Sequence, residues 1–152
     1  MVKRSFIVSI FVVPAMILVV GGCSDDDDNG VTVEELGAVS LTIDYAGTVS
    51  ENRPIIIEIK DNKLSDPIRR AKATEDDASV TITDIPTTKD WVIALYQDLD
   101  NNGEYDELSE PIVFYSAGEP DHSVGALGDA TAINLSPGET YDAGTIAFAD
   151  DS

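Results

Sequence analysis

The chain has 152 residues, the size of one domain with a short accessory segment. Its 29 acidic residues stand against 9 basic ones, which gives a formal net charge of −20 at pH 7. A chain so acidic repels nucleic acids and anionic lipid head groups, so we expect neither as a partner. The single cysteine, Cys23, excludes an internal disulfide as a source of stability.

Residues 1–22 are predicted to be a secretory signal peptide. Lys3 and Arg4 make a basic start, and an apolar run over residues 6–20 follows. This run is shorter than the roughly 20 residues that a membrane-spanning helix needs, and Pro14 interrupts it. A segment that is removed during export therefore fits better than a permanent membrane anchor.

The expected cleavage point lies among small residues. Residues 20–23, VGGC, resemble the lipobox of bacterial lipoproteins, in which the cysteine thiol is acylated and becomes the first mature residue. The resemblance implies a lipid anchor at Cys23 that holds the protein to a membrane of the bacterial cell envelope. In that family an aspartate after the cysteine favours the inner membrane; Ser24 stands here, so we expect the outer membrane. A plain signal peptide with an incidental cysteine, or an unprocessed membrane helix, is the alternative.

Residues 23–37 are predicted to be the lipidated cysteine and a flexible acidic tether. Four consecutive aspartates occupy positions 25–28, and residues 24–30 contain no apolar side chain. Like charges in a row repel one another and keep a chain extended. Removal of residues 1–22 would delete two bases and no acid, so the net charge would change from −20 to −22.

Residues 38–152 are predicted to form one all-β domain. Apolar and polar residues alternate in several runs, and other runs of strand length are continuously apolar, as in buried strands. Seven segments are strand candidates: 39–45, 54–60, 79–85, 91–97, 111–115, 130–135 and 145–149. Turn-forming residues separate them, and no amphipathic helical pattern of useful length occurs. We therefore predict a β-sandwich of about seven strands in Greek-key style.

Three segments give more specific expectations. Segment 91–97 is apolar on both faces, which is typical of a central strand. Residues 61–77 are predicted to be a polar connection with at most one helical turn over 68–74, and residues 116–129 a long loop. The bases of the polar connection are predicted to be solvated charges that pair loosely with nearby acids, and a bound anion or sugar acid is the alternative. These bases include Arg69, Arg70 and Lys72.

Residues 98–110, directly after the most apolar strand candidate, carry the clearest chemistry in the chain. Carboxylate and amide side chains stand at alternate positions, and Gly103 permits a sharp turn after the third of them. Hard cations such as calcium take several oxygen ligands from a tightly curved backbone. The predicted ligands of a structural calcium ion are Asp98, Asp100, Asn102, Glu104 through its carbonyl, Asp106 and Glu110.

This loop resembles the EF-hand loop and the D-x-D-x-N-G-x-x-D loops of dockerins and of some secreted β-sandwich modules. An EF-hand needs a glutamate at its twelfth position, where this chain has Ser109, with Glu110 one residue later. An EF-like loop between two strands is therefore expected instead of an EF-hand. The apolar strand that leads into the loop, together with residues 135–146, resembles small transthyretin-like (prealbumin-like) modules, which implies that fold.

A simpler interpretation is that Asn102-Gly103 is a hairpin turn and that the acids around it are solvated. Charge favours the cation, because the segment from Asp90 to Ser152 contains no lysine or arginine to neutralise them. Magnesium prefers compact octahedral shells, and zinc prefers histidine or cysteine, neither of which lies near the loop.

Catalysis is not expected. The sole histidine, His122, lies between Asp121 and Ser123, and adjacent residues cannot adopt the relayed geometry of a catalytic triad. The crowded acids of the loop do not indicate the cleft that glycoside hydrolysis needs. We expect a binding or accessory module of the cell envelope that takes a glycan or protein ligand through aromatic side chains. The candidates are Trp91, Tyr105 and Tyr115. Trp91 and Phe114 lie in strand-like runs, however, and burial is the expectation for both. A purely structural envelope protein is the alternative.

Overall fold

The computed structural model describes residues 35–126 and 128–149, which contain eight β-strands and no helix. Within these residues there is accordingly no helix that could cross a membrane. The predicted signal peptide (1–22), the lipidated Cys23 and all but the last residues of the predicted tether (23–37) lie outside the described part of the chain.

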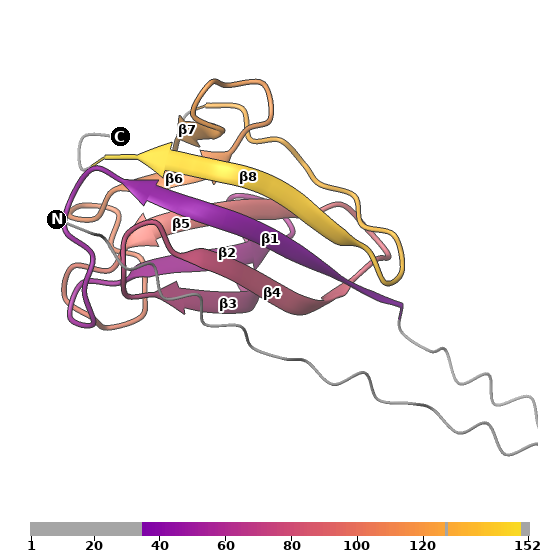
Figure 1. Cartoon of the computed structure of the whole chain (residues 1–152), viewed down its shortest axis with the longest axis horizontal. Coiled ribbons are helices and arrows are strands. Elements are labelled where there is room, and N and C mark those ends of the chain that lie inside the picture. Colours follow the sequence, from indigo (N-terminus) through magenta and orange to yellow (C-terminus); the bar gives the residue numbers. More distant parts are fainter. Residues whose placement is uncertain (1–34, 127, 150–152) are drawn as a thin grey trace, which may run out of the picture. The chain divides into compact units, whose positions relative to one another are not determined.

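The strands form two sheets that pack face to face (Figure 1). One sheet has the order β4-β1-β8, and the other has the order β3-β2-β5-β6-β7. β1 and β8 run parallel, whereas every other pair is antiparallel. The strands are β1 (Leu36–Tyr45), β2 (Ile55–Lys60), β3 (Pro67–Ala73), β4 (Ser79–Pro86), β5 (Val92–Gln97), β6 (Ile112–Tyr115), β7 (Ser123–Gly125) and β8 (Thr140–Phe148). The predicted all-β sandwich is confirmed.

The main core lies between the two sheets and follows the alternation of the sequence. In β1 every second residue from Val39 to Tyr45 is buried, because successive side chains of a strand point to opposite faces. Ile57 of β2 and Leu95 of β5 face them from the other sheet, and both are completely buried. Hydrophobic burial between the sheets is thus the main source of stability.

The five-stranded sheet is also covered on its outer face. A second cluster of buried side chains lies there, and the half-buried Tyr105, Val124 and Ala130 pack against it. Its members are Ile56, Val92, Ala94, Tyr96, Ile112 and Phe114. β5 is therefore buried on both faces and has two strands on each side, which confirms the predicted central strand. Tyr105 belongs to the acidic loop, so the loop folds over this face.

Two strands lie where loops are predicted. β3 occupies most of the predicted polar connection, and β7 lies inside the predicted loop 116–129. β3 has no apolar alternation because it is an edge strand, in which the basic side chains face water or an acid of the neighbouring strand. Its order comes from pairing with β2. β7 is too short to show any period.

Three predicted segments differ most from the structure. β1 begins at Leu36 instead of 39, so it includes the last two residues of the predicted tether. Segment 130–135 is not a strand; Ile133 only forms an isolated bridge with Trp91, with both N–H···O distances at 2.8 Å. β8 begins at Thr140 instead of 145 because a bulge interrupts its alternation. Gly144, with φ of +72°, supplies the backbone conformation at that irregularity.

Two leucines test the location of the core with the same substitution. Leu95 is completely buried and Leu108 is 96% exposed. Leu95→Ala should lower the free energy of unfolding by about 2–5 kcal/mol, because it leaves a cavity between the sheets. Leu108→Ala should change it by less than about 0.5 kcal/mol. Chemical denaturation of both variants measures the difference, and equal losses would contradict the assigned core.

Candidate metal centre

The acidic loop joins two neighbouring strands of the five-stranded sheet. β5 ends at Gln97, β6 begins at Ile112, and Tyr96 stands opposite Ile112 in the antiparallel ladder. The loop is therefore longer than the two-residue turn that Asn102-Gly103 alone would make. Its ends are close together because the last ladder bond, from Gln97 N–H to the carbonyl of Pro111, closes it at 3.2 Å.

Asp98 is the first acid of the loop, and only 1% of it is exposed. Its own N–H donates to the carbonyl of Pro54 at 3.0 Å, which fixes its backbone beside β2. Its carboxylate accepts two backbone N–H groups, from Asn102 at 3.0 Å and from Gly103 at 2.8 Å. The first half of the loop thus curls around this carboxylate.

Glu110 closes the loop at its other end and is 6% exposed. One of its carboxylate oxygens accepts the N–H of Leu99 at 2.7 Å, and the other accepts the N–H of Asp106 at 2.9 Å. Because Leu99 is next to Asp98, these bonds hold the end of the loop against its beginning. Buried carboxylates are stable only with such hydrogen bonds or a charged partner.

Three of the predicted ligands meet. One carboxylate oxygen each from Asp98, Asp100 and Glu110 lies within 4.8 Å of the other two. Asp98 and Glu110 are buried, whereas Asp100 is exposed and closes the group from the solvent side. A carboxylate oxygen that accepts one N–H keeps a further lone pair, so both buried groups can still bind a cation.

The other three predicted ligands belong to exposed residues of the loop between Asp100 and Glu110. The Asn102 side chain is occupied: its oxygen accepts the N–H of Glu104 at 2.6 Å, and its nitrogen donates to Asp100 at 3.0 Å. Glu104 and Asp106 are exposed. The N–H of Leu108 donates to the Asp106 carboxylate at 3.1 Å, and this bond lowers the pKa of Asp106.

Positive φ angles create the sharp turn of the loop. Asn101 has φ of +60°, a conformation that asparagine tolerates, and Gly103 has φ of +77°. The carbonyl of Gly103 accepts two hydrogen bonds, from the Tyr96 hydroxyl and from Arg70, each at 3.1 Å. Burial, followed by the negative charge of Glu58, raises the pKa of Tyr96 to about 12, so its hydroxyl remains a donor at neutral pH.

The aromatic side chains proposed to contact a ligand are mostly inside the domain. Trp91 is 2% exposed and donates to the carbonyl of Pro86 at 2.6 Å, and Tyr115 is 3% exposed and bonds to the hydroxyl of Tyr141 at 3.0 Å. Tyr105 is half-buried, and its ring centroid lies 5.5 Å from that of Tyr96. The burial of Trp91 agrees with the expectation for a strand-like run, and neither Trp91 nor Tyr115 is exposed to contact a ligand.

The residues around His122 serve packing and strand connection. His122 stacks on Tyr115, with ring centroids 6.3 Å apart and an interplanar angle of 23°. The hydroxyl of Ser123 donates to the carbonyl of Ala147, and the N–H of Ala147 donates to the carbonyl of Asp121. Both groups thus link the loop before β7 to β8.

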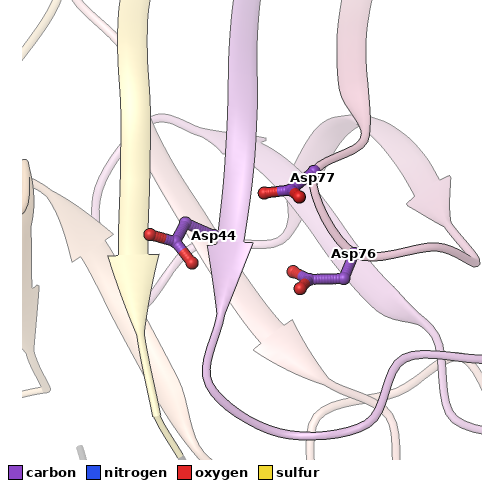
Figure 2. A group of neighbouring side chains, drawn as sticks. All are labelled: Asp44, Asp76 and Asp77. Atoms are coloured by element: carbon purple, nitrogen blue, oxygen red, sulfur yellow. The ribbon is translucent and has the colours of Figure 1, made fainter. Parts of the chain in front are cut away.

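A second acidic group was not predicted from the sequence. Asp44 at the end of β1 lies near Asp76 and Asp77 of the β3–β4 turn, and Figure 2 shows the latter two side chains pointing toward β1. One oxygen of each lies within 4.8 Å of the others, and all three are exposed. The antiparallel pairing of β1 with β4 creates this group. Thr42 stands opposite Ser79, so Asp44 comes close to the residues that precede Ser79 in the chain.

No protein-family model, curated protein or solved structure matches this chain. A function is therefore inferred from the residues and their geometry.

Two glycines test whether the turn of the loop depends on its backbone conformation. A Cβ atom at Gly103 or at Gly118 would meet nothing within 4 Å, but only Gly103 has a positive φ. Gly103→Ala should therefore destabilise the protein by about 1–2 kcal/mol. Gly118→Ala should be neutral or slightly stabilising. Thermal unfolding with chelator present compares them; equal melting temperatures would contradict the assigned loop conformation.

Proposed function

We propose that the protein is a non-catalytic lipoprotein of the bacterial cell envelope with a β-sandwich domain that one calcium ion stabilises. The convergence of Asp98, Asp100 and Glu110 carries this proposal. Two of the three carboxylates are buried at opposite ends of the loop, which is the arrangement expected of ligands and not of solvated surface charges.

Charge supports a cation in this position. Carboxylates that lie close together in a site with little water repel one another, and an opposite charge relieves that repulsion. Arg70 and Lys72 reach the loop, but they contact the carbonyl of Gly103 and the side chain of Asn101. In residues 35–126 and 128–149 no ion pair involves any of the three carboxylates.

The donor atoms favour calcium over other cations. All three side chains offer oxygen, the atom that hard cations prefer, and calcium accepts irregular shells of six to eight such ligands. Zinc would select histidine or cysteine. Asn102, the carbonyl of Glu104 and Asp106 are the remaining predicted ligands, and a small rearrangement of the exposed loop or bound water would complete the shell.

The position of the ion indicates a structural effect. It would join the end of the central strand β5 to the start of β6, because Asp98 follows Gln97 and Glu110 precedes Pro111. Extracellular calcium modules typically have dissociation constants of about 10⁻⁴–10⁻³ M. Such affinity suits a compartment in which calcium is abundant and its concentration is not a signal.

The cellular setting of the proposal comes from the sequence. The lipobox-like residues 20–23 support a lipid anchor at Cys23, and Ser24 supports the outer membrane. A lipid-tethered, non-catalytic β-sandwich suits an accessory or binding domain whose ligand is a glycan or a protein. A structural envelope protein with a solvated acidic loop is the alternative, and the burial of Asp98 and Glu110 disfavours it.

Calcium should stabilise the unaltered protein. With the dissociation constants above, 10 mM calcium adds about 1.4–2.7 kcal/mol to the free energy of unfolding, because only the folded state binds it. The melting temperature should therefore be several degrees higher in calcium than in chelator. An unchanged melting temperature across millimolar calcium would contradict the proposed site.

A matched pair of variants assigns the effect to this loop. Asp100→Asn removes one exposed charge from the candidate metal centre, and Asp44→Asn removes one from the second acidic group. Both residues are exposed, so neither substitution should disturb the core. Asp100→Asn should abolish most of the calcium-induced shift, whereas Asp44→Asn should retain it. The reverse result would move calcium binding to the other group.

The lipid anchor has an independent test. Cys23→Ser keeps the size of the side chain but removes the thiol that would be acylated. In a bacterial expression host, the unaltered chain should incorporate a labelled fatty acid and collect in the membrane fraction, and the variant should do neither. Labelling of the variant would contradict the lipoprotein assignment.

A further inference from the structure

The basic residues of strand β3 are divided between the two faces of the five-stranded sheet. Arg70 stands opposite Glu58 and Lys72 opposite Ile56, so both lie on the outer face of the five-stranded sheet, which the loop covers. Arg69 stands opposite Ile59 and lies on the other face, because side chains alternate along a strand. Arg70 therefore lies on the face that the loop covers, whereas the adjacent Arg69, which has the same charge, does not.

Arg70 connects the sheet to the loop through two hydrogen-bonding groups. Its Nε lies 2.8 Å from a carboxylate oxygen of Glu58, which is 3% exposed. Its Nη1 donates to the carbonyl of Gly103 at 3.1 Å. The pair with a buried carboxylate fixes the guanidinium in place, and the planar fork can hold both partners at once.

Gly103 links this contact to the candidate metal centre. Its carbonyl accepts Arg70 and the Tyr96 hydroxyl, and its N–H donates to the carboxylate of Asp98 at 2.8 Å. A shift of Gly103 would therefore change the orientation of Asp98. Lys72 holds the same turn by a second bond, from Nζ to the side chain of Asn101 at 2.9 Å.

We propose that Arg70 is a positioning residue for cation binding: it holds Gly103 so that the Asp98 carboxylate faces Asp100 and Glu110 before calcium arrives. This inference rests on the proposed calcium site. Its physical basis is preorganisation, because a loop that is already ordered loses less conformational entropy when it binds.

The direction in which calcium affinity changes when Arg70 is removed distinguishes a positioning role from an effect of its charge. A guanidinium near a cation site repels the cation, so if charge alone mattered, removal of Arg70 would tighten calcium binding. If Arg70 positions the loop, its removal weakens calcium binding. A purely structural role would lower the melting temperature without changing the affinity of the folded protein.

Calcium titration calorimetry on the full chain, purified in mild detergent, distinguishes these roles at a temperature where each variant is folded. Arg70→Gln should weaken calcium binding about three- to tenfold, the effect of losing one hydrogen bond that orders the loop. Arg69→Gln makes the same change of charge on the other face. Among the described residues Arg69 bonds only to the carbonyl of Ile68, so this variant should bind calcium within twofold of the unaltered protein.

Two further variants make the result independent of charge. Arg70→Lys keeps the charge but not the planar fork, and should bind calcium as weakly as Arg70→Gln. Tyr96→Phe removes the other donor to Gly103 and no charge, so it should also weaken binding. If Arg70→Gln does not fold, these two variants decide the question.

The outcomes are distinct for the two proposals. Unaltered protein that binds no calcium would overturn both the calcium site and the role of Arg70. Unaltered protein that binds calcium, with Arg70→Gln binding equally or more tightly, would overturn only the role of Arg70. Weaker binding of Arg70→Gln that Arg70→Lys fully restores would show that the planar fork of the guanidinium is not required, and would overturn the positioning role assigned to it.

Discussion

Two carboxylates, those of Asp98 and Glu110, are buried at opposite ends of one loop and have oxygens that lie close together. Each accepts two backbone N–H groups, so the loop is folded around them. Like charges in a poorly hydrated site favour a positive partner between them. The sequence from Asp90 to Ser152 contains no lysine or arginine, and the proposed calcium ion supplies that charge.

The rest of the fold provides a rigid base for this loop. β5, which leads into it, is the middle strand of its sheet and is buried on both faces, so the position of Asp98 is fixed by the core. Tyr105 packs over the same sheet, and Gly103 is held by Tyr96 and Arg70. The loop is thereby attached to strands β2, β3 and β5 through hydrogen bonds and packing, although most of its side chains are exposed.

Local patterns in the sequence predicted the structural features that are set within a single strand. Alternation found β1 and the double-sided apolar run found β5, because burial imposes those periods. Spacing brought Asp98, Asp100 and Glu110 into one set but could not show that Asn102 bonds within the loop. β3 was missed because its order comes from pairing with β2, and its bases are held by partners distant in the sequence.

Native mass spectrometry of the full chain, with and without calcium, tests the central claim most directly. One calcium ion should remain bound per chain of the unaltered protein, because the buried carboxylates of Asp98 and Glu110 hold it away from bulk solvent. Glu110→Gln should lose the ion. A chain that retains no calcium, or retains it equally after Glu110→Gln, would contradict the assignment of these carboxylates as ligands.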